Sequence, residues 1–163
     1  MRRKRIKDEE WIQKNNEKME QEKFEIAFIN EDIGKGVFAK APVEKGELVM
    51  EYRGLLSPAD NDAPDATYVY FFQHQEKEYC IDATDNESIA RYVNDIDYKT
   101  KPNCKVKKVI VNGIPRLVIF AIRDIAKGVE LRYDYGCRDN PWRSLKINTL
   151  LFSTPATYLS NFE

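Results

Sequence analysis

The stretch RDIAKGVELRYDYG, residues 123–136, joins a charged turn to a strand-like run that carries two tyrosines. Asp124 to Gly128 has turn composition, and Val129 to Tyr135 is rich in residues that favour strands. Tyr133 and Tyr135 are two positions apart, so a strand places both rings on one face of its sheet. Such a face serves core packing, or it lines a channel for a long cationic side chain, because aromatic faces attract ammonium groups.

Outward from this stretch, the chain repeats short strand-like runs separated by turns. Phe24, Ile26 and Phe28 alternate with polar residues, which predicts a strand. Two strand-like runs, 106–111 and 114–122, flank Asn112-Gly113, the strongest short signal for a β-hairpin. Residues 8–23 contain no Pro or Gly and favour a solvent-facing helix with little apolar surface. We therefore expect a mostly β fold with an N-terminal flanking helix.

Composition excludes several classes of protein. The 163 residues carry a net charge of -1 and a single histidine, His74, so neither a globally basic nucleic-acid coat nor a two-histidine metal site is expected. The three cysteines form no CxxC motif, which argues against a zinc ribbon or a disulfide framework. No run approaches the apolar length of a membrane span, and no apolar signal-peptide region opens the chain.

The order of five motifs is more specific than any one of them. They are GKGVFA at 34–39, MEYRG at 50–54, YCIDAT at 79–84, RYVN at 91–94 with PNC at 102–104, and RDIAKGVELRYDYG at 123–136. In this order and spacing they resemble a SET-domain lysine methyltransferase over residues 24–143. YVYFFQ at 68–73 and the compact end without a CxC segment most resemble the PR-SET type that monomethylates histone H4.

The resemblance implies a fold of several small β-sheets around a pseudoknot in which the RYVN and YDYG segments pass each other. It divides the chain into a charged N-terminal arm and flanking helix (1–23), a SET domain (24–143) and a divergent C-terminal tail (144–163). It also implies S-adenosyl-L-methionine as cofactor, bound on one face, with the substrate lysine entering from the other.

Roles for individual residues follow from the same resemblance. Tyr135 matches the catalytic tyrosine, and Tyr52 and Tyr133 would line the lysine channel. The remaining assignments concern the cofactor: the backbone of Ile33, Gly34 and Lys35 for its methionine end, Tyr68 for the pocket wall, Asn94 and Asp95 for its amino group and adenine, and Trp142 against the adenine. No metal is implied.

The chemistry suits these residue types. A lysine amine has an ordinary pKa of about 10.4, so it is protonated and unreactive at neutral pH. A dry aromatic channel beside a sulfonium lowers that pKa by desolvation and like-charge repulsion, and tyrosine hydroxyls then orient the amine. A tyrosine at position 133 is typical of monomethylating members, so we expect one methyl group to be added.

Four departures from the family pattern leave an alternative open. Asp95 replaces the histidine of an Asn-His pair, the loop DIDYKTKPNC at 95–104 is longer, Cys137 replaces an acidic residue, and the tail at 144–163 does not match the expected C-terminal helix. A catalytically impaired SET-like module that binds cofactor or histone tail is therefore the second hypothesis, and a plain β-rich interaction domain is a third.

The expected partners are a histone tail or another lysine-containing protein, and nucleosomal DNA through the basic run Arg2–Arg5. We expect a monomer without membrane association. A histone substrate implies a nuclear, chromosomal location, and a cytoplasmic pool is also compatible with the sequence.

Overall fold

The computed structural model describes residues 2–59, 68–86, 88–97, 99–136 and 160–161, and of residues 2–6 and 160–161 only the backbone. Its elements are α1 (Arg2–Lys14), α2 (Glu17–Lys23), β1 (Phe24–Asn30), β2 (Gly34–Ala39), β3 (Leu48–Glu51), β4 (Leu55–Pro58), β5 (Val69–His74), β6 (Lys77–Asp82), the 3-10 helix η1 (Ile89–Tyr92), β7 (Asn94–Asp95), β8 (Cys104–Val111), β9 (Ile114–Ala121), β10 (Arg132–Tyr133) and β11 (Ser160–Asn161). The expectation of a mostly β fold with small sheets and an N-terminal helix is confirmed.

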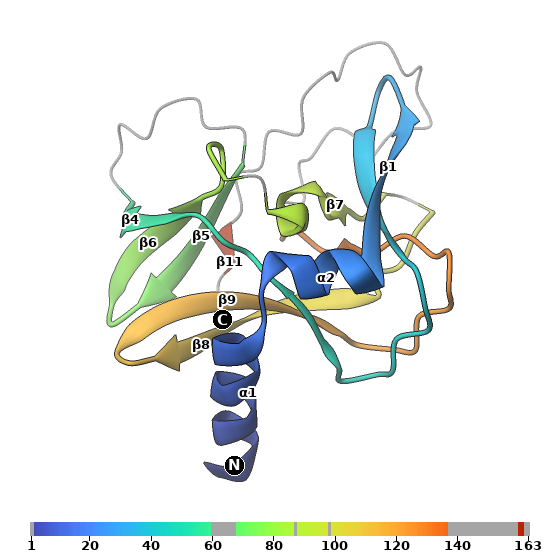
Figure 1. Ribbon diagram of the computed structural model, residues 1–163. Helices are drawn as coiled ribbons and strands as arrows, with labels where there is room; N and C mark the ends of the chain where they lie inside the picture. Colours follow the sequence, from blue (N-terminus) through green and yellow to red (C-terminus); the bar gives the residue numbers. More distant parts are fainter. Residues whose placement is uncertain (1, 60–67, 87, 98, 137–159, 162–163) are drawn as a thin grey trace.

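Three small sheets build the molecule. The first is the β1–β2 hairpin, the second has the order β3-β9-β8-β10-β7, and the third has the order β11-β5-β6-β4. Figure 1 shows the β1–β2 hairpin on one side, the β4–β6 strands on the other, and η1 with β7 between them. A continuous core of buried residues extends from Phe24 through Met50 and Leu117 to Leu131.

The long β8–β9 hairpin forms where the Asn-Gly pair predicts it. Asn112 and Gly113 both have positive φ, 51° and 77°, as a two-residue hairpin turn with matching twist requires. The strands pair in register from Val111↔Ile114 to Cys104↔Ala121. The hairpin prediction is therefore confirmed.

The N-terminal segment differs from the single, weakly packed helix that its composition predicts. The helix breaks into α1 and α2, and Asn16 caps α2 by accepting the backbone N–H of Met19 at 3.0 Å. Ile12 is buried in a cluster with Leu48, Val109, Val111 and Val118. Ile12 and the partly buried Trp11 attach α1 to the second sheet, and Asp8 of α1 pairs with Lys107 of β8 at 2.8 Å.

Glu20 of α2 is also buried, although its type predicts exposure. Its carboxylate accepts hydrogen bonds from Asn15 Nδ2 at 2.6 Å, from the backbone N–H of Glu51 at 2.9 Å and from Arg53 at 2.8 Å. A buried carboxylate is stable only with such partners. These bonds join α2 to β3 and the residues that follow it.

The strand predicted from Val129 to Tyr135 is shorter than expected, since β10 contains only Arg132 and Tyr133. Residues 129–131 bond to β2 instead: Ala39 N–H donates to the Val129 carbonyl at 3.1 Å, and Leu131 N–H donates to the Val37 carbonyl at 2.8 Å. Residues 129–133 thus pair first with β2 and then with β7, and they connect the β1–β2 hairpin to the second sheet.

Among the described residues, no helix combines the length and apolarity needed to span a bilayer.

Candidate active site

Two segments that are distant in the chain lie side by side at the centre of the molecule. β10 pairs in parallel with β7, Arg132 opposite Asn94 and Tyr133 opposite Asp95. On its other edge, Tyr133 pairs with Cys104 at the start of β8. We call this parallel pairing of β7 with β10 the crossing. It brings the RYVN and YDYG motifs together, as the resemblance to the SET-domain family implies.

Four tyrosines form a buried cluster around this crossing. Tyr133 and Tyr135 have ring centroids 4.7 Å apart, Tyr70 lies 6.4 Å from Tyr133, and Tyr52 lies 5.8 Å from Tyr70. All four are at most 3% exposed. The structure therefore brings together the three tyrosines singled out from the sequence and adds Tyr70.

The sequence contains a pattern that indicates a core position for Tyr70, although Tyr70 was not among the predicted site residues. It is two positions after Tyr68 on an aromatic strand, and a buried strand of that composition faces the core with every second residue. Its neighbours in space are Tyr52, directly after β3, and Tyr133 of β10, so only the folded chain reveals the contacts.

Burial keeps these phenols protonated. Desolvation, followed by the charge of Asp82, raises the pKa of Tyr52 well above 10.0. Burial raises the pKa of Tyr133 and Tyr135 in the same direction, with further contributions from neighbouring tyrosines and from Asp95. Near neutral pH the cluster is an uncharged wall of rings and hydroxyl groups.

Tyr135 is anchored at both ends by the residues next to Asn94. Its hydroxyl donates to the Val93 carbonyl at 2.7 Å, and its backbone N–H donates to Asp95 Oδ1 at 2.8 Å. The Tyr133 side chain also hydrogen-bonds to this hydroxyl. Because a hydroxyl oxygen has two lone pairs and its own proton goes to a carbonyl, it can still accept one further donor. The carboxylate at position 95 thus has a definite structural role.

Asn94 connects the crossing to the start of β2, where Gly34, Lys35 and Gly36 belong to the strand and the turn is formed by residues 31–33. Its Nδ2 donates to the Lys35 carbonyl at 3.0 Å and to Glu130 Oε1 at 3.0 Å. In the turn that precedes β2, Asn30 Oδ1 accepts the backbone N–H of Ile33 at 2.8 Å. Lys35 therefore lies beside Asn94, and Ile33 and Gly34 directly precede Lys35 in the chain.

Tyr68 reaches the same region through η1. Its ring packs edge-on against Tyr92 at 5.8 Å, and the Arg91 guanidinium lies over both rings at 4.9 and 4.8 Å. Lys35 Nζ lies 5.2 Å from the centroid of the Tyr92 ring. Sequence reasoning did not single out Arg91 or Tyr92, although both belong to the RYVN motif.

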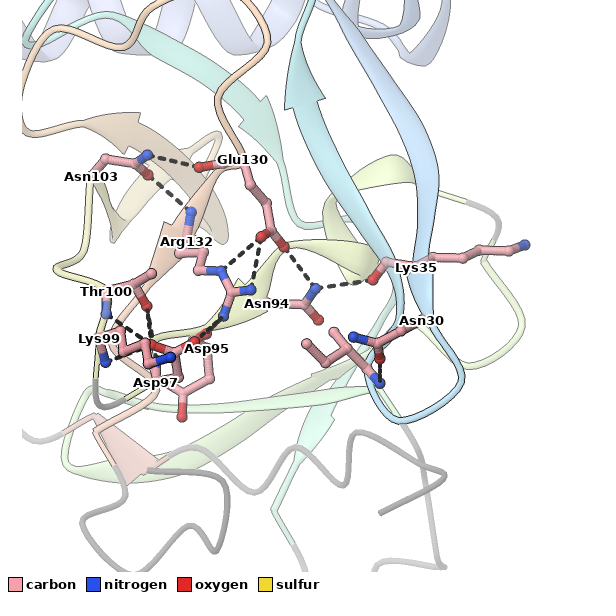
Figure 2. A network of polar contacts seen from close by, with 11 residues as sticks. Asn30, Lys35, Asn94, Asp95, Asp97, Lys99, Thr100, Asn103, Glu130 and Arg132 are labelled. Atoms are coloured by element: carbon pink, nitrogen blue, oxygen red, sulfur yellow. Dashed lines mark hydrogen bonds and ion pairs between the residues drawn. The ribbon is translucent and has the colours of Figure 1, made fainter. Parts of the chain in front are cut away.

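A polar network supports the other side of Asn94 (Figure 2). The Arg132 guanidinium binds the Glu130 carboxylate at 2.8 Å and the Asp95 carbonyl at 3.0 Å. Asn103 donates to the Glu130 carbonyl at 2.8 Å and accepts the Arg132 N–H at 2.9 Å. Sequence reasoning missed Glu130, Arg132 and Asn103, because nothing local indicates that they meet.

The long loop after Asp95 is closed by its own hydrogen bonds. Asp97 Oδ1 accepts from the backbone N–H groups of Lys99 and Thr100 at 2.7 and 2.8 Å and from the Thr100 hydroxyl at 2.9 Å. Partial burial opposes ionisation, but these bonds and Arg132 together lower the pKa of Asp97.

Trp142, expected to contact the adenine, and Cys137, a departure from the family pattern, lie outside the described residues.

The SET domain family matches residues 34–136. This match spans more than half of the chain, and the chain belongs to the SET-domain family. The matched range lies within residues 24–143 and includes the tyrosine cluster and the crossing described above.

Curated relatives carry methyltransferase names. The chain is 38% identical over 134 residues to N-lysine methyltransferase KMT5A-A of Danio rerio, covering 72% of this chain and 38% of that protein. It is 38% identical over 126 residues to histone-lysine N-methyltransferase set-1 of Caenorhabditis elegans, covering 67% of this chain and 51% of that protein. The chain therefore spans about half or less of the length of these two relatives.

Solved structures share the fold. CpSET8 from Cryptosporidium superposes with a TM-score of 0.60 at 31% identity, covering 71% of this chain and 58% of that one. The ATXR5 SET domain in complex with histone H3 dimethylated on R26 gives 0.64 at 26% identity, covering 74% and 62%. ctPRC2 bound to S-adenosylmethionine gives 0.57 at 30% identity, covering 69% and 15%.

Proposed function

We propose that this chain is an S-adenosylmethionine-dependent protein-lysine methyltransferase that adds one methyl group to its substrate lysine. The observation that carries the proposal is the junction at Val93 and Asn94. The Tyr135 hydroxyl donates to the Val93 carbonyl, and the next residue, Asn94, donates to the Lys35 carbonyl at the start of β2. A channel lined by tyrosines and a cofactor-binding segment at Lys35 would meet at this junction.

The residues present fit such a cofactor. Lys35 and Asn94 are hydrogen-bonded to each other, and Tyr68 and Lys35 both contact Tyr92. The start of β2 at Lys35 and the residue Tyr68 thus converge on the continuous segment of η1 and Asn94, and these residues would hold the methionine end, amino group and adenine. The neighbour bound to S-adenosylmethionine has the same fold over the larger part of this chain.

When bound, S-adenosylmethionine supplies an electrophilic methyl carbon on positive sulfur. The chain would position the substrate amine and keep water away from it. Because Tyr52, Tyr133 and Tyr135 stay protonated, none of them acts as a phenolate base near neutral pH. Their burial would instead lower the pKa of an entering lysine ammonium, and the Tyr135 oxygen would accept an amine N–H and orient the nitrogen.

The number of methyl groups would depend on Tyr133. Its ring lies against Tyr135, and its hydroxyl adds a polar group to the buried cluster. A hydroxyl that holds a water beside the amine would block rotation of a methylated product. We therefore propose monomethylation.

The proposed substrate is the tail of histone H4 or another basic protein tail, which would place the protein in the nucleus at chromatin. The names of the relatives support a histone or other protein lysine as acceptor. Contact of the basic run at Arg2–Arg5 with nucleosomal DNA belongs to the same proposal.

A labelling assay tests this function. The purified chain is incubated with methyl-labelled S-adenosylmethionine and either nucleosomes or an H4 tail peptide, and mass spectrometry counts the methyl groups. Label in the wild-type chain that falls by about a hundredfold or more in Tyr135→Phe supports the proposal. Cofactor binding without label would favour the impaired binding module, and undiminished label in Tyr135→Phe would remove Tyr135 from its role.

A further inference from the structure

The amide of Asn94 is held in one orientation by two acceptors. Its Nδ2 donates to a backbone carbonyl at Lys35 and to a side-chain carboxylate at Glu130, both at 3.0 Å. A carbonyl and an ionised carboxylate only accept hydrogen bonds, so the amide oxygen cannot replace the nitrogen at either contact. The Oδ1 atom must therefore turn away from both, as Figure 2 shows.

Glu130 is itself held rigidly. Arg132 binds its Oε2 through two nitrogens at 2.8 Å, and Asn103 fixes its backbone carbonyl. Its backbone also pairs with Phe38 of β2. A carboxylate fixed in this way acts as a permanent partner for Asn94.

Gly36, the third residue of β2, makes room for this carboxylate. A Cβ atom at Gly36 would lie 2.6 Å from Glu130 Oε1 and 2.7 Å from Ile29 Cδ1. Oε1 is the same oxygen that accepts from Asn94. The same atom, Glu130 Oε1, therefore excludes a side chain at position 36 and holds the amide of Asn94.

We propose that Glu130 is a positioning residue that orients Asn94, so that Oδ1 faces the cofactor as an acceptor for a primary ammonium or amine. This inference rests on the proposed function, because it takes Asn94 as a cofactor ligand. In this proposal Glu130 does not touch the cofactor. It acts by accepting a hydrogen bond from the second N–H of the Asn94 amide.

Calorimetry with S-adenosylhomocysteine tests the inference on the full chain. Glu130→Ala should weaken binding by about tenfold to a hundredfold, since Asn94 loses its charge-assisted partner. Glu130→Gln keeps an oxygen that can accept from Asn94 and should weaken binding less. Glu47→Gln, which alters a surface ion pair with Lys23, is the matched control and should bind like the wild type.

A double-mutant cycle separates positioning from an independent effect. In an Asn94→Ala background, Glu130→Ala should cause no further loss of affinity. If the two losses multiply, or if Glu130→Ala binds like the wild type, the inference is overturned. Thermal unfolding checks each variant for folding, and if Glu130→Ala does not fold, the same cycle with Glu130→Gln decides.

NMR of the free chain tests the orientation without the cofactor. Both side-chain amide protons of Asn94 should show hydrogen-bonded shifts, and one should move toward its free position in Glu130→Ala. Unchanged shifts would overturn the inference. If the wild-type chain binds no S-adenosylhomocysteine, the proposed function fails, and the NMR measurement still decides whether Glu130 orients Asn94.

Discussion

Asp95 accepts the backbone N–H of Tyr135 on its Oδ1 atom at 2.8 Å. The two residues lie on either side of the crossing, and both are buried. Asp95 is the position at which this chain departs from the Asn-His pair of the family pattern. Because its carboxylate accepts a hydrogen bond from a buried backbone N–H, the residue at this departure holds Tyr135 in place.

Removing this acceptor should damage both stability and activity. Asp95→Ala leaves a buried N–H without a partner, which costs about 1–3 kcal/mol. We expect that loss of stability by urea denaturation and at least a tenfold loss of methyl transfer, because Tyr135 is no longer held. Asp95→Asn, which still has an acceptor oxygen, should stay close to wild type. Equal losses in both variants would contradict this explanation.

Tyr133→Phe should change the product and leave the reaction running. The substitution removes one hydroxyl from the buried cluster and leaves the ring contact with Tyr135. We expect dimethylated peptide to appear beside the monomethylated product in mass spectra. Tyr70→Phe, a change of the same kind on β5, is the control and should leave the product monomethylated. Only monomethylated product from Tyr133→Phe would disprove the role of the hydroxyl.

Gly36→Ala should reproduce the loss of Glu130. The new methyl group would occupy the space of Glu130 Oε1, so either the carboxylate or β2 must shift. We expect S-adenosylhomocysteine to bind about tenfold or more weakly, as in Glu130→Ala. Combining the two substitutions should add little to either one. Wild-type affinity in Gly36→Ala would show that the close approach is unimportant for binding.

Stability should fall in alkaline solution. Burial raises the pKa of the Cys104 thiol from 9.0 to about 12, and burial raises the pKa of Tyr52, Tyr133 and Tyr135 above 10.0. These groups lose protons first in the unfolded chain, so raising the pH favours unfolding. Each contributes up to about 1.4 kcal/mol per pH unit, for Cys104 between about pH 9 and 12 and for the tyrosines from about pH 10 upward.

Urea denaturation at about pH 8 and about pH 10.5 measures this loss. Cys104→Ala supplies the control, since it removes one of the buried groups and should make the decline with pH shallower. The same dependence on pH in both proteins would mean that Cys104 does not contribute.

The buried carboxylate of Glu20 should contribute more to the free energy of unfolding than an exposed residue of α2 does. Glu20→Ala leaves the Arg53 guanidinium, whose side chain is 17% exposed, without its nearest carboxylate partner. We expect a loss of about 3 kcal/mol in the free energy of unfolding. Glu22→Ala on the exposed side of the same helix should change stability by less than about 0.5 kcal/mol. Equal effects of the two substitutions would refute the ion-pair explanation.

Most of the strands could be predicted because their signals are local. Alternating apolar residues mark β1, aromatic residues mark β5, and the Asn-Gly pair marks the β8–β9 turn. Ile26 and Phe28 show the limit of such signals, since they are 39% and 67% exposed on a correctly predicted strand. Periodicity indicates a strand, but it does not show whether a neighbour covers its apolar face.

The tyrosines of the site could be selected from motif order, but their partners could not. Glu130 reads as an ordinary charged residue beside a turn, and Asp95 reads as a departure from a pattern. Their functions depend on Asn94 and Tyr135, which are 36 and 40 positions away in the chain. Neither periodicity nor composition contains that information.

The turns, the strand-forming runs and the residue types of the candidate site are therefore properties of the chain itself, because backbone preference and side-chain chemistry act over a few neighbouring residues. Folding alone determined that four tyrosines share one buried cluster, that Glu20 lies in the interior, and that Glu130 and Lys35 orient Asn94. These arrangements arise from contacts between segments that meet only when β7 and β10 cross, and burial then makes each hydrogen bond obligatory.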